Sequence, residues 1–189
     1  MFSVSVTFMI LMRTLHSYLT GPMETIRAIL PHFRANQGGG IINTSSGGGL
    51  FGLPLGTLYH SSKFALEGFT ESLTYELASQ NIFVKSVIPF SGVSSTEFGA
   101  RVAGERPKGP PPASYEPFLQ TTLARYGQMV SEIKISSHDV ALRIYEAATD
   151  GKDNLRYLIG HDTRGFIKAR YESKNDEEYM AHMRAYFSE

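Results

Sequence analysis

A chain of 189 residues, 42% hydrophobic and 12% aromatic, is long and apolar enough for one domain with its own core, which excludes intrinsic disorder. Eighteen basic residues balance eighteen acidic ones, so no charged field favours nucleic acid or a membrane surface. Because cysteine is absent, disulfides, thiolate metal sites and cysteine nucleophiles are also excluded, and we expect a cytoplasmic protein.

The N-terminal segment is apolar as far as Arg13, which is too short to cross a bilayer, since a crossing takes about 20 apolar residues. Val4, Val6 and Phe8 alternate with serine and threonine. This alternation favours a core strand within residues 1–13 over a membrane anchor. We therefore expect no membrane partner.

A helix with one buried stripe is predicted from Leu15 to Phe33, where apolar residues recur at spacings of three and four. Pro22 leaves two alternatives open, because a proline is tolerated in a first turn but kinks a helix interior. Either the helix begins near Gly21, or a longer helix kinks there. Glycines then separate this helix from a buried strand, residues 41–44.

A second long helix is expected from near Thr57 to near Ser79, followed by a strand over residues 83–88. Strands that alternate with long helices through short connections predict a parallel sheet covered by helices. Ligand sites in such sheets lie at the carboxyl ends of the strands. Here those positions come after Thr44 and after Ile88.

The rest of the chain is predicted to begin with a flexible surface loop at residues 104–117, because this segment contains five prolines. Further elements are expected at helices 116–129, 137–149 and 175–187 and at a strand over 155–159. Ser137 is the expected N-cap of the helix that starts there. We find no internal repeat, so residues 1–189 are interpreted as a single domain.

The glycine-rich segment after the first buried strand contains two competing motifs. Gly47, Gly49 and Gly52 fit the phosphate fingerprint G-x-G-x-x-G, but the helix that should hold the anion begins only near Thr57. The acidic residue expected about 20 positions later would fall inside a helix. The spacing of these glycines is therefore interpreted as coincidental.

The second motif is a proton-transfer set of Ser46, Tyr59 and Lys63. Tyr59 and Lys63 are four residues apart, so they share one face of a helix, where a nearby ammonium lowers the pKa of a phenol from about 10. A hydroxyl from Ser46 would hold a substrate oxygen beside that phenol. These side chains predict acid and base chemistry on an alcohol or a carbonyl.

The order of strand, Ser-Ser, glycine-rich loop and Tyr-x-x-x-Lys resembles the short-chain dehydrogenase/reductase family, from about Leu19 to Thr96. The segments that carry the resemblance are LPHFR at 30–34, IINTSS at 41–46 and YHSSKFALEG at 59–68. The resemblance implies that Tyr59 is the general acid/base, that Lys63 lowers its pKa and binds the nicotinamide ribose, and that Ser46 binds the reacting oxygen. It also implies NAD or NADP as cofactor, with the cofactor-binding residues Tyr59, Lys63, Pro89, Val93 and Thr96.

The chain departs from the family pattern before these motifs. The glycine-rich turn T-G-x-x-x-G-x-G and the segment N-N-A-G are missing. We therefore expect a Rossmann-like parallel α/β sheet with flanking helices that lacks the N-terminal βαβαβ half. Tyr18 stands where the family has an asparagine, and Phe90 stands where it has a glycine after proline.

Two functions stay open. One is an NAD(P)-dependent oxidoreductase that transfers hydride between nicotinamide and a small alcohol or carbonyl substrate. The other is a truncated, catalytically inert family member that acts as a structural or interaction protein. The six histidines show no ligand spacing, so no metal site is predicted. Because the family dimerises through the two long helices, a homo-oligomer is expected.

Overall fold

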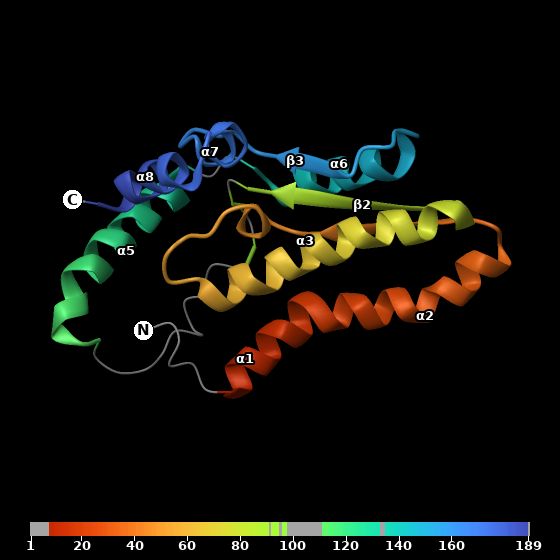
Figure 1. Cartoon of the computed structure of the whole chain (residues 1–189), viewed down its shortest axis with the longest axis horizontal. Coiled ribbons are helices and arrows are strands. Elements are labelled where there is room, and N and C mark those ends of the chain that lie inside the picture. Colours follow the sequence, from red (N-terminus) through yellow and green to blue (C-terminus); the bar gives the residue numbers. More distant parts are fainter. Residues whose placement is uncertain (1–7, 91, 95, 98–110, 133–134, 189) are drawn as a thin grey trace.

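A three-stranded sheet forms the centre of the computed structural model, which describes residues 8–90, 92–94, 96–97, 111–132 and 135–188 (Figure 1). The strands are β1 (Gly39–Thr44), β2 (Ile82–Pro89) and β3 (Arg156–Ile159), in the order β1-β2-β3. Both pairings are parallel. The predicted parallel α/β sheet is confirmed, and β1 forms one edge of it in the part of the chain that the structure describes.

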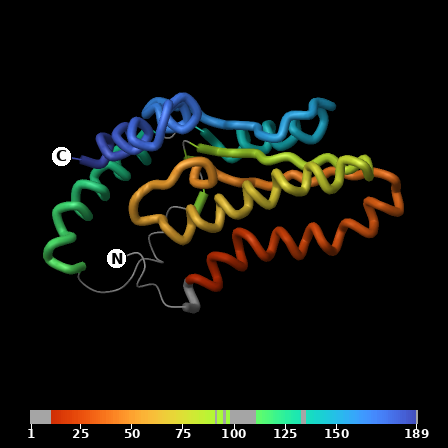
Figure 2. The backbone as a smooth tube through the Cα atoms, viewed as in Figure 1, coloured from red at the N-terminus to blue at the C-terminus, as the bar shows by residue number. Residues whose placement is uncertain are grey.

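Helices cover both faces and one end of the sheet. They are α1 (Phe8–Leu15), α2 (Gly21–Ala35), α3 (Thr57–Leu77), α5 (Glu116–Ser131), α6 (Ser137–Thr149), α7 (Phe166–Glu172) and α8 (Asp176–Phe187). Helices α2 and α3 lie on one side of the sheet, and α5, α7 and α8 gather near the end towards which β2 points (Figures 1 and 2). None of the helices in the described ranges is long and apolar enough to cross a membrane.

The two faces of the sheet carry separate cores because successive residues of a strand point in opposite directions. Ile41 and Val84 pack with side chains of α2 and α3. Their neighbours Ile42 and Lys85 contact α6 instead. The strands therefore need apolar or fully paired side chains on both faces, as expected of a parallel sheet covered by helices.

The segment expected to be an N-terminal strand is helical where the structure describes it. Residues 1–7 lie outside the described part, but residues 8–13 belong to α1. Leu11 and Met12 are unbranched at Cβ and favour a helix. One π-helical turn (His16–Thr20) joins α1 to α2, which has Pro22 in its first turn, where no N–H donor is required. The regular α-helix therefore begins at Gly21, as the first alternative has it, while the π-helical turn continues the helical backbone back into α1.

Two other element boundaries differ from the sequence prediction. Much of the proline-rich segment lies outside the described residues, but its end is regular, since Ala113–Tyr115 forms a 3-10 turn and Pro117 lies in the first turn of α5. The N-cap of α6 is Ser136 rather than Ser137. The Ser136 hydroxyl accepts from the Asp139 N–H at 3.2 Å, and the Asp139 carboxylate accepts from the Ser136 N–H at 2.7 Å, a reciprocal pair that Ser137 cannot form.

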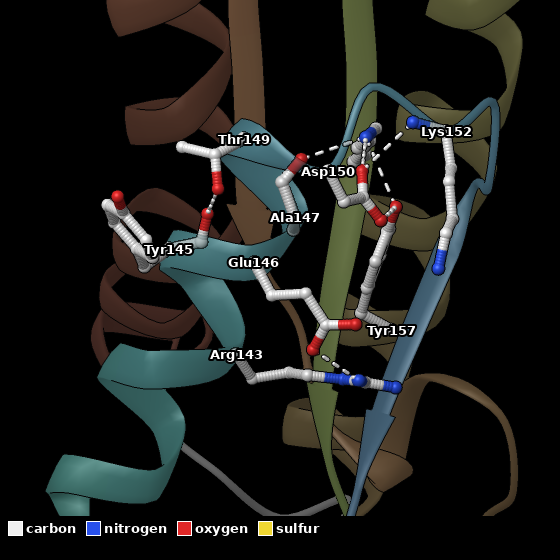
Figure 3. A network of polar contacts seen from close by, with 9 residues as sticks. Arg143, Tyr145, Glu146, Ala147, Thr149, Asp150, Lys152 and Tyr157 are labelled. Atoms are coloured by element: carbon white, nitrogen blue, oxygen red, sulfur yellow. Dashed lines mark hydrogen bonds and ion pairs between the residues drawn. The ribbon is translucent and has the colours of Figure 1, made fainter.

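A buried polar network joins α6 to the sheet (Figure 3). The ammonium of Lys85, a residue only 4% exposed, donates to the Ala147 carbonyl at 2.8 Å, the Asp150 carboxylate at 3.0 Å and the Tyr157 hydroxyl at 3.1 Å. These three partners match the three N–H groups of an ammonium. Although burial opposes it, hydrogen bonds from the Lys152 N–H and from Lys85 lower the pKa of Asp150 to about 2. The charge pair is therefore fully compensated.

Candidate active site

The segments that follow β1 and β2 leave the sheet at the same edge and touch. Beyond the end of β1, the Ser45 N–H still donates to the Val87 carbonyl at 2.8 Å. A Cβ on Gly47 would lie 2.7 Å from the Cβ of Phe90, so the glycine-rich turn packs directly on the residue after Pro89. The two positions predicted for a ligand site thus form one location.

Ser46 is the N-cap of a 3-10 turn (Gly47–Gly49), where its hydroxyl accepts from the Gly48 N–H at 3.1 Å. A Cβ on Gly48 would lie 2.9 Å from the Tyr59 ring, and one on Gly49 would lie 2.9 Å from the Lys63 carbonyl oxygen. The glycines therefore let the turn approach α3 closely. Since α3 begins only at Thr57, this packing supports the interpretation that the phosphate fingerprint is coincidental.

The three residues of the predicted proton-transfer set meet at the end of β1. The side chains of Ser46 and Tyr59 are hydrogen-bonded to each other. Lys63 lies one helical turn after Tyr59, is only 7% exposed, and donates from its ammonium to the Thr44 carbonyl at 3.0 Å. A hydroxyl, a phenol and an ammonium therefore line one site.

Tyr18, on the π-helical turn, contacts both Tyr59 and Lys63 of α3. Its ring meets the Tyr59 ring edge-on, with the centroids 5.3 Å apart and the planes at 90°. The ammonium of Lys63 lies 5.0 Å from the Tyr18 ring centroid, within the range of a cation–π contact. The sequence identified position 18 only as a departure from the family asparagine, since spacing along the chain does not show this contact.

The electrostatics of Tyr59 differ from the expectation. Burial raises the pKa of Tyr59 above its ordinary value; the hydrogen bond with Ser46 opposes this rise and Tyr18 adds to it. Burial also lowers the pKa of Lys63 to about 8, opposed by the negative charge of Glu67. The expected lowering of the Tyr59 pKa is therefore not found, because burial disfavours the phenolate and the Lys63 ammonium contacts Thr44 and Tyr18.

Glu67 is buried one turn beyond Lys63, with only 4% of its surface exposed. Its carboxylate accepts from the Ser86 hydroxyl and, at 2.8 Å, from the Arg156 guanidinium. Arg156 also pairs with Glu71 at 2.6 Å. Buried charges are tolerated when they are paired in this way, so ion pairs join α3 to β3 and a hydrogen bond joins α3 to β2.

The remaining predicted cofactor residues follow β2. Pro89 ends that strand, and the exposed Thr96 donates from its hydroxyl to the Val93 carbonyl at 3.4 Å. A groove of about 690 Å³ lies elsewhere, between α2 and the edge strand β1. No three histidine, aspartate or glutamate side chains of the described part gather closely enough to hold a metal ion.

Comparison with known proteins shows that residues 5–106 match the family described as short chain dehydrogenase. An uncharacterized oxidoreductase of Schizosaccharomyces pombe is 40% identical over 142 residues, which are 74% of this chain and 56% of that protein. Retinol dehydrogenase 8 of Bos taurus is 32% identical over 141 residues, which are 72% of this chain and 44% of that protein. The chain thus spans about half the length of the curated relatives it matches.

The fold has a solved counterpart as well. A short-chain dehydrogenase from Streptomyces avermitilis superposes with a TM-score of 0.69 and 26% sequence identity. The superposition covers 95% of this chain and 64% of that one. The arrangement of sheet and helices described above is therefore shared with a larger protein of the same type.

Proposed function

Because the chain belongs to the short-chain dehydrogenase family, we propose that it serves a nicotinamide-dependent oxidoreductase reaction on an alcohol or a carbonyl. The observation that carries the proposal is the meeting of Ser46, Tyr59 and Lys63 at the end of β1. A hydroxyl, a phenol and a buried ammonium in one place can orient a substrate oxygen and exchange a proton with it.

Tyr59 acts as the proton donor in the direction of carbonyl reduction. Its raised pKa keeps the phenol neutral at neutral pH, so the form that can donate a proton predominates. The phenol O–H bond breaks as a new O–H bond forms on the substrate oxygen, while hydride adds to the carbonyl carbon. Ser46, held by the Gly48 N–H, orients that oxygen through its hydroxyl.

A nicotinamide cofactor, when bound, would supply or accept the hydride of this reaction. The residues present fit its nicotinamide ribose end, because Thr44 accepts one N–H of the Lys63 ammonium and an ammonium has three. We assign Lys63 to the ribose hydroxyls, and Pro89, Val93 and Thr96 to the nicotinamide. The glycine turn does not fit a pyrophosphate, since its glycines are packed against α3 and Phe90.

Cofactor binding tests this proposal most directly. We expect NADH or NADPH to change its fluorescence saturably on titration into the chain at concentrations below about 1 mM. Lys63→Met should weaken that binding at least about 10-fold, because a charge-assisted hydrogen bond is lost. Lys168→Met, at an exposed lysine of α7, is the matched control and should leave binding unchanged. Absence of saturation with both cofactors rejects the proposal for this chain and favours the structural or interaction role.

The pH dependence of the reaction follows from the pKa of Tyr59. Because this pKa is raised, the phenol stays protonated to higher pH, so reduction should remain level up to about pH 10 and fall only above it. The rate of oxidation depends on the phenolate and should still rise at about pH 10.

Retinal and retinol are the first substrates to test, given the similarity to retinol dehydrogenase 8. The rates are measured at saturating cofactor, because Lys63 loses its charge near its pKa of about 8 and cofactor binding should then weaken. A reduction rate that already falls near neutral pH contradicts this role.

A further inference from the structure

His60 follows Tyr59 on α3 and joins this helix to the segment that carries Ser46. Its Nε2 accepts from the Leu53 N–H at 3.1 Å, and its Nδ1 lies 3.0 Å from the Gly48 carbonyl oxygen. One imidazole thus bonds two backbone groups that lie five residues apart in the glycine-rich segment. His60 lies within the segment at 59–68 that carries the family resemblance, but neither composition nor motif assigned it a role.

These two contacts define the form of the ring. The Leu53 N–H can only donate, so Nε2 carries no proton, and Nδ1 then carries the proton that is donated to Gly48. Burial lowers the pKa of His60 below its ordinary value, opposed by the bond to Gly48. The neutral imidazole that both bonds require is therefore the stable form at neutral pH.

Gly48 connects His60 to the reacting groups. Its carbonyl accepts from His60, while its N–H donates to the Ser46 hydroxyl at 3.1 Å. Ser46 in turn is hydrogen-bonded to Tyr59. A shift of Gly48 therefore moves the Ser46 hydroxyl relative to the phenol. The surrounding space is tight, since a Cβ on Gly56 would lie 2.9 Å from the His60 Nε2.

We propose that His60 is a positioning residue that holds the glycine-rich turn where the Ser46 hydroxyl meets the Tyr59 phenol. The proposal rests on the proposed function in treating Ser46 and Tyr59 as the reacting pair, but the alignment itself is measurable without cofactor or turnover. A second anchor, the Tyr126 hydroxyl, donates to the Pro54 carbonyl at 2.7 Å beyond the turn. Removal of the imidazole thus takes one hydrogen bond from Gly48 and one from Leu53, and leaves the anchor at Pro54 in place.

The test compares His60→Phe, which keeps a ring without hydrogen bonds, with His60→Gln, which retains a donor and an acceptor. The protein is labelled with carbon-13 at the tyrosine Cζ and studied by NMR. The resonance of Tyr59 is identified as the one that is missing in the Tyr59→Phe variant. In His60→Phe this resonance should move towards its position in Ser46→Ala, and amide exchange at Leu53 should accelerate at least about 10-fold. His60→Gln should restore part of both effects. His32→Phe, at an exposed histidine of α2, should change neither.

A second variant tests the same alignment with His60 unchanged. Gly56→Ala places a methyl group 2.9 Å from Nε2 and should displace the ring from the Leu53 N–H, giving the same two changes. Circular dichroism shows whether His60→Phe folds. If it does not fold, Gly56→Ala is used for the test instead. An unchanged Tyr59 resonance and unchanged Leu53 exchange in the folded variants overturn the proposal. Failure of the proposed function is separate, because it appears as absent cofactor binding in the unaltered chain.

Discussion

Replacement of Tyr59 by phenylalanine should lower kcat for the proposed carbonyl reduction by about 10²–10⁴-fold, the range that general acid catalysis contributes. The variant loses one hydroxyl and keeps the ring that packs edge-on against Tyr18. Because Lys63 and Thr44 are unchanged, cofactor binding should persist. Stopped-flow or steady-state rates at saturating NADH or NADPH, with fluorescence titration beside them, measure both quantities.

Tyr75→Phe is the matched control for this substitution. Tyr75 lies on the same helix, but it is 76% exposed and distant in sequence from the site, so its loss of a hydroxyl should leave kcat within about twofold. Turnover that survives Tyr59→Phe rejects the assignment of Tyr59 as the proton donor. An equal loss in both variants also rejects it, because the effect would then not depend on the site.

Replacement of Lys85 by methionine should lower the free energy of unfolding by about 3 kcal/mol or more, the cost of removing one partner of a buried ion pair. The side chains of Lys85 and Asp150 are only 5% and 10% exposed, so the Asp150 carboxylate loses its charge partner at a site with little access to water. The Ala147 carbonyl and the Tyr157 hydroxyl also lose a donor. For a chain of this length, such a loss lowers Tm by roughly 6–12 °C.

Lys168→Met provides the comparison for the stability measurement. Lys168 and Glu172 lie 3.9 Å apart, with side chains 73% and 66% exposed, and a pair of this kind contributes less than about 1 kcal/mol. Urea unfolding followed by circular dichroism gives the free energy of both variants. A Lys85→Met protein as stable as the Lys168→Met protein contradicts the structural role of the network.

Several elements were predictable because their signals are local. The helix predicted over 137–149 matches α6, and the predicted strands fall within β2 or overlap β1 and β3, since apolar periodicity depends only on neighbouring residues. Helix α7 was missed, because Phe166–Glu172 is too short to establish a period. The strand predicted before Arg13 is wrong for residues 8–13, where a run of apolar residues fits a strand or a buried helix equally well.

The sequence by itself determined to which family the chain belongs, and its motifs predicted Ser46, Tyr59 and Lys63 as the residues of the site. Tyr59 and Lys63 share a helix face at any orientation of that helix, and the resemblance drawn from these motifs is confirmed by the match over residues 5–106. Order and spacing are properties of the chain, so they can be recognised before the fold is known.

Only the tertiary structure decided how the site is held and how it titrates. The contacts of Tyr18 with Tyr59 and of His60 with Gly48 and Leu53 join separate elements, and no spacing along the chain predicts them. The pKa of Tyr59 is raised rather than lowered, because it depends on burial and on where the Lys63 ammonium points. Desolvation and hydrogen bonding are properties of the folded arrangement, and here they outweigh the neighbour that the sequence places four residues away.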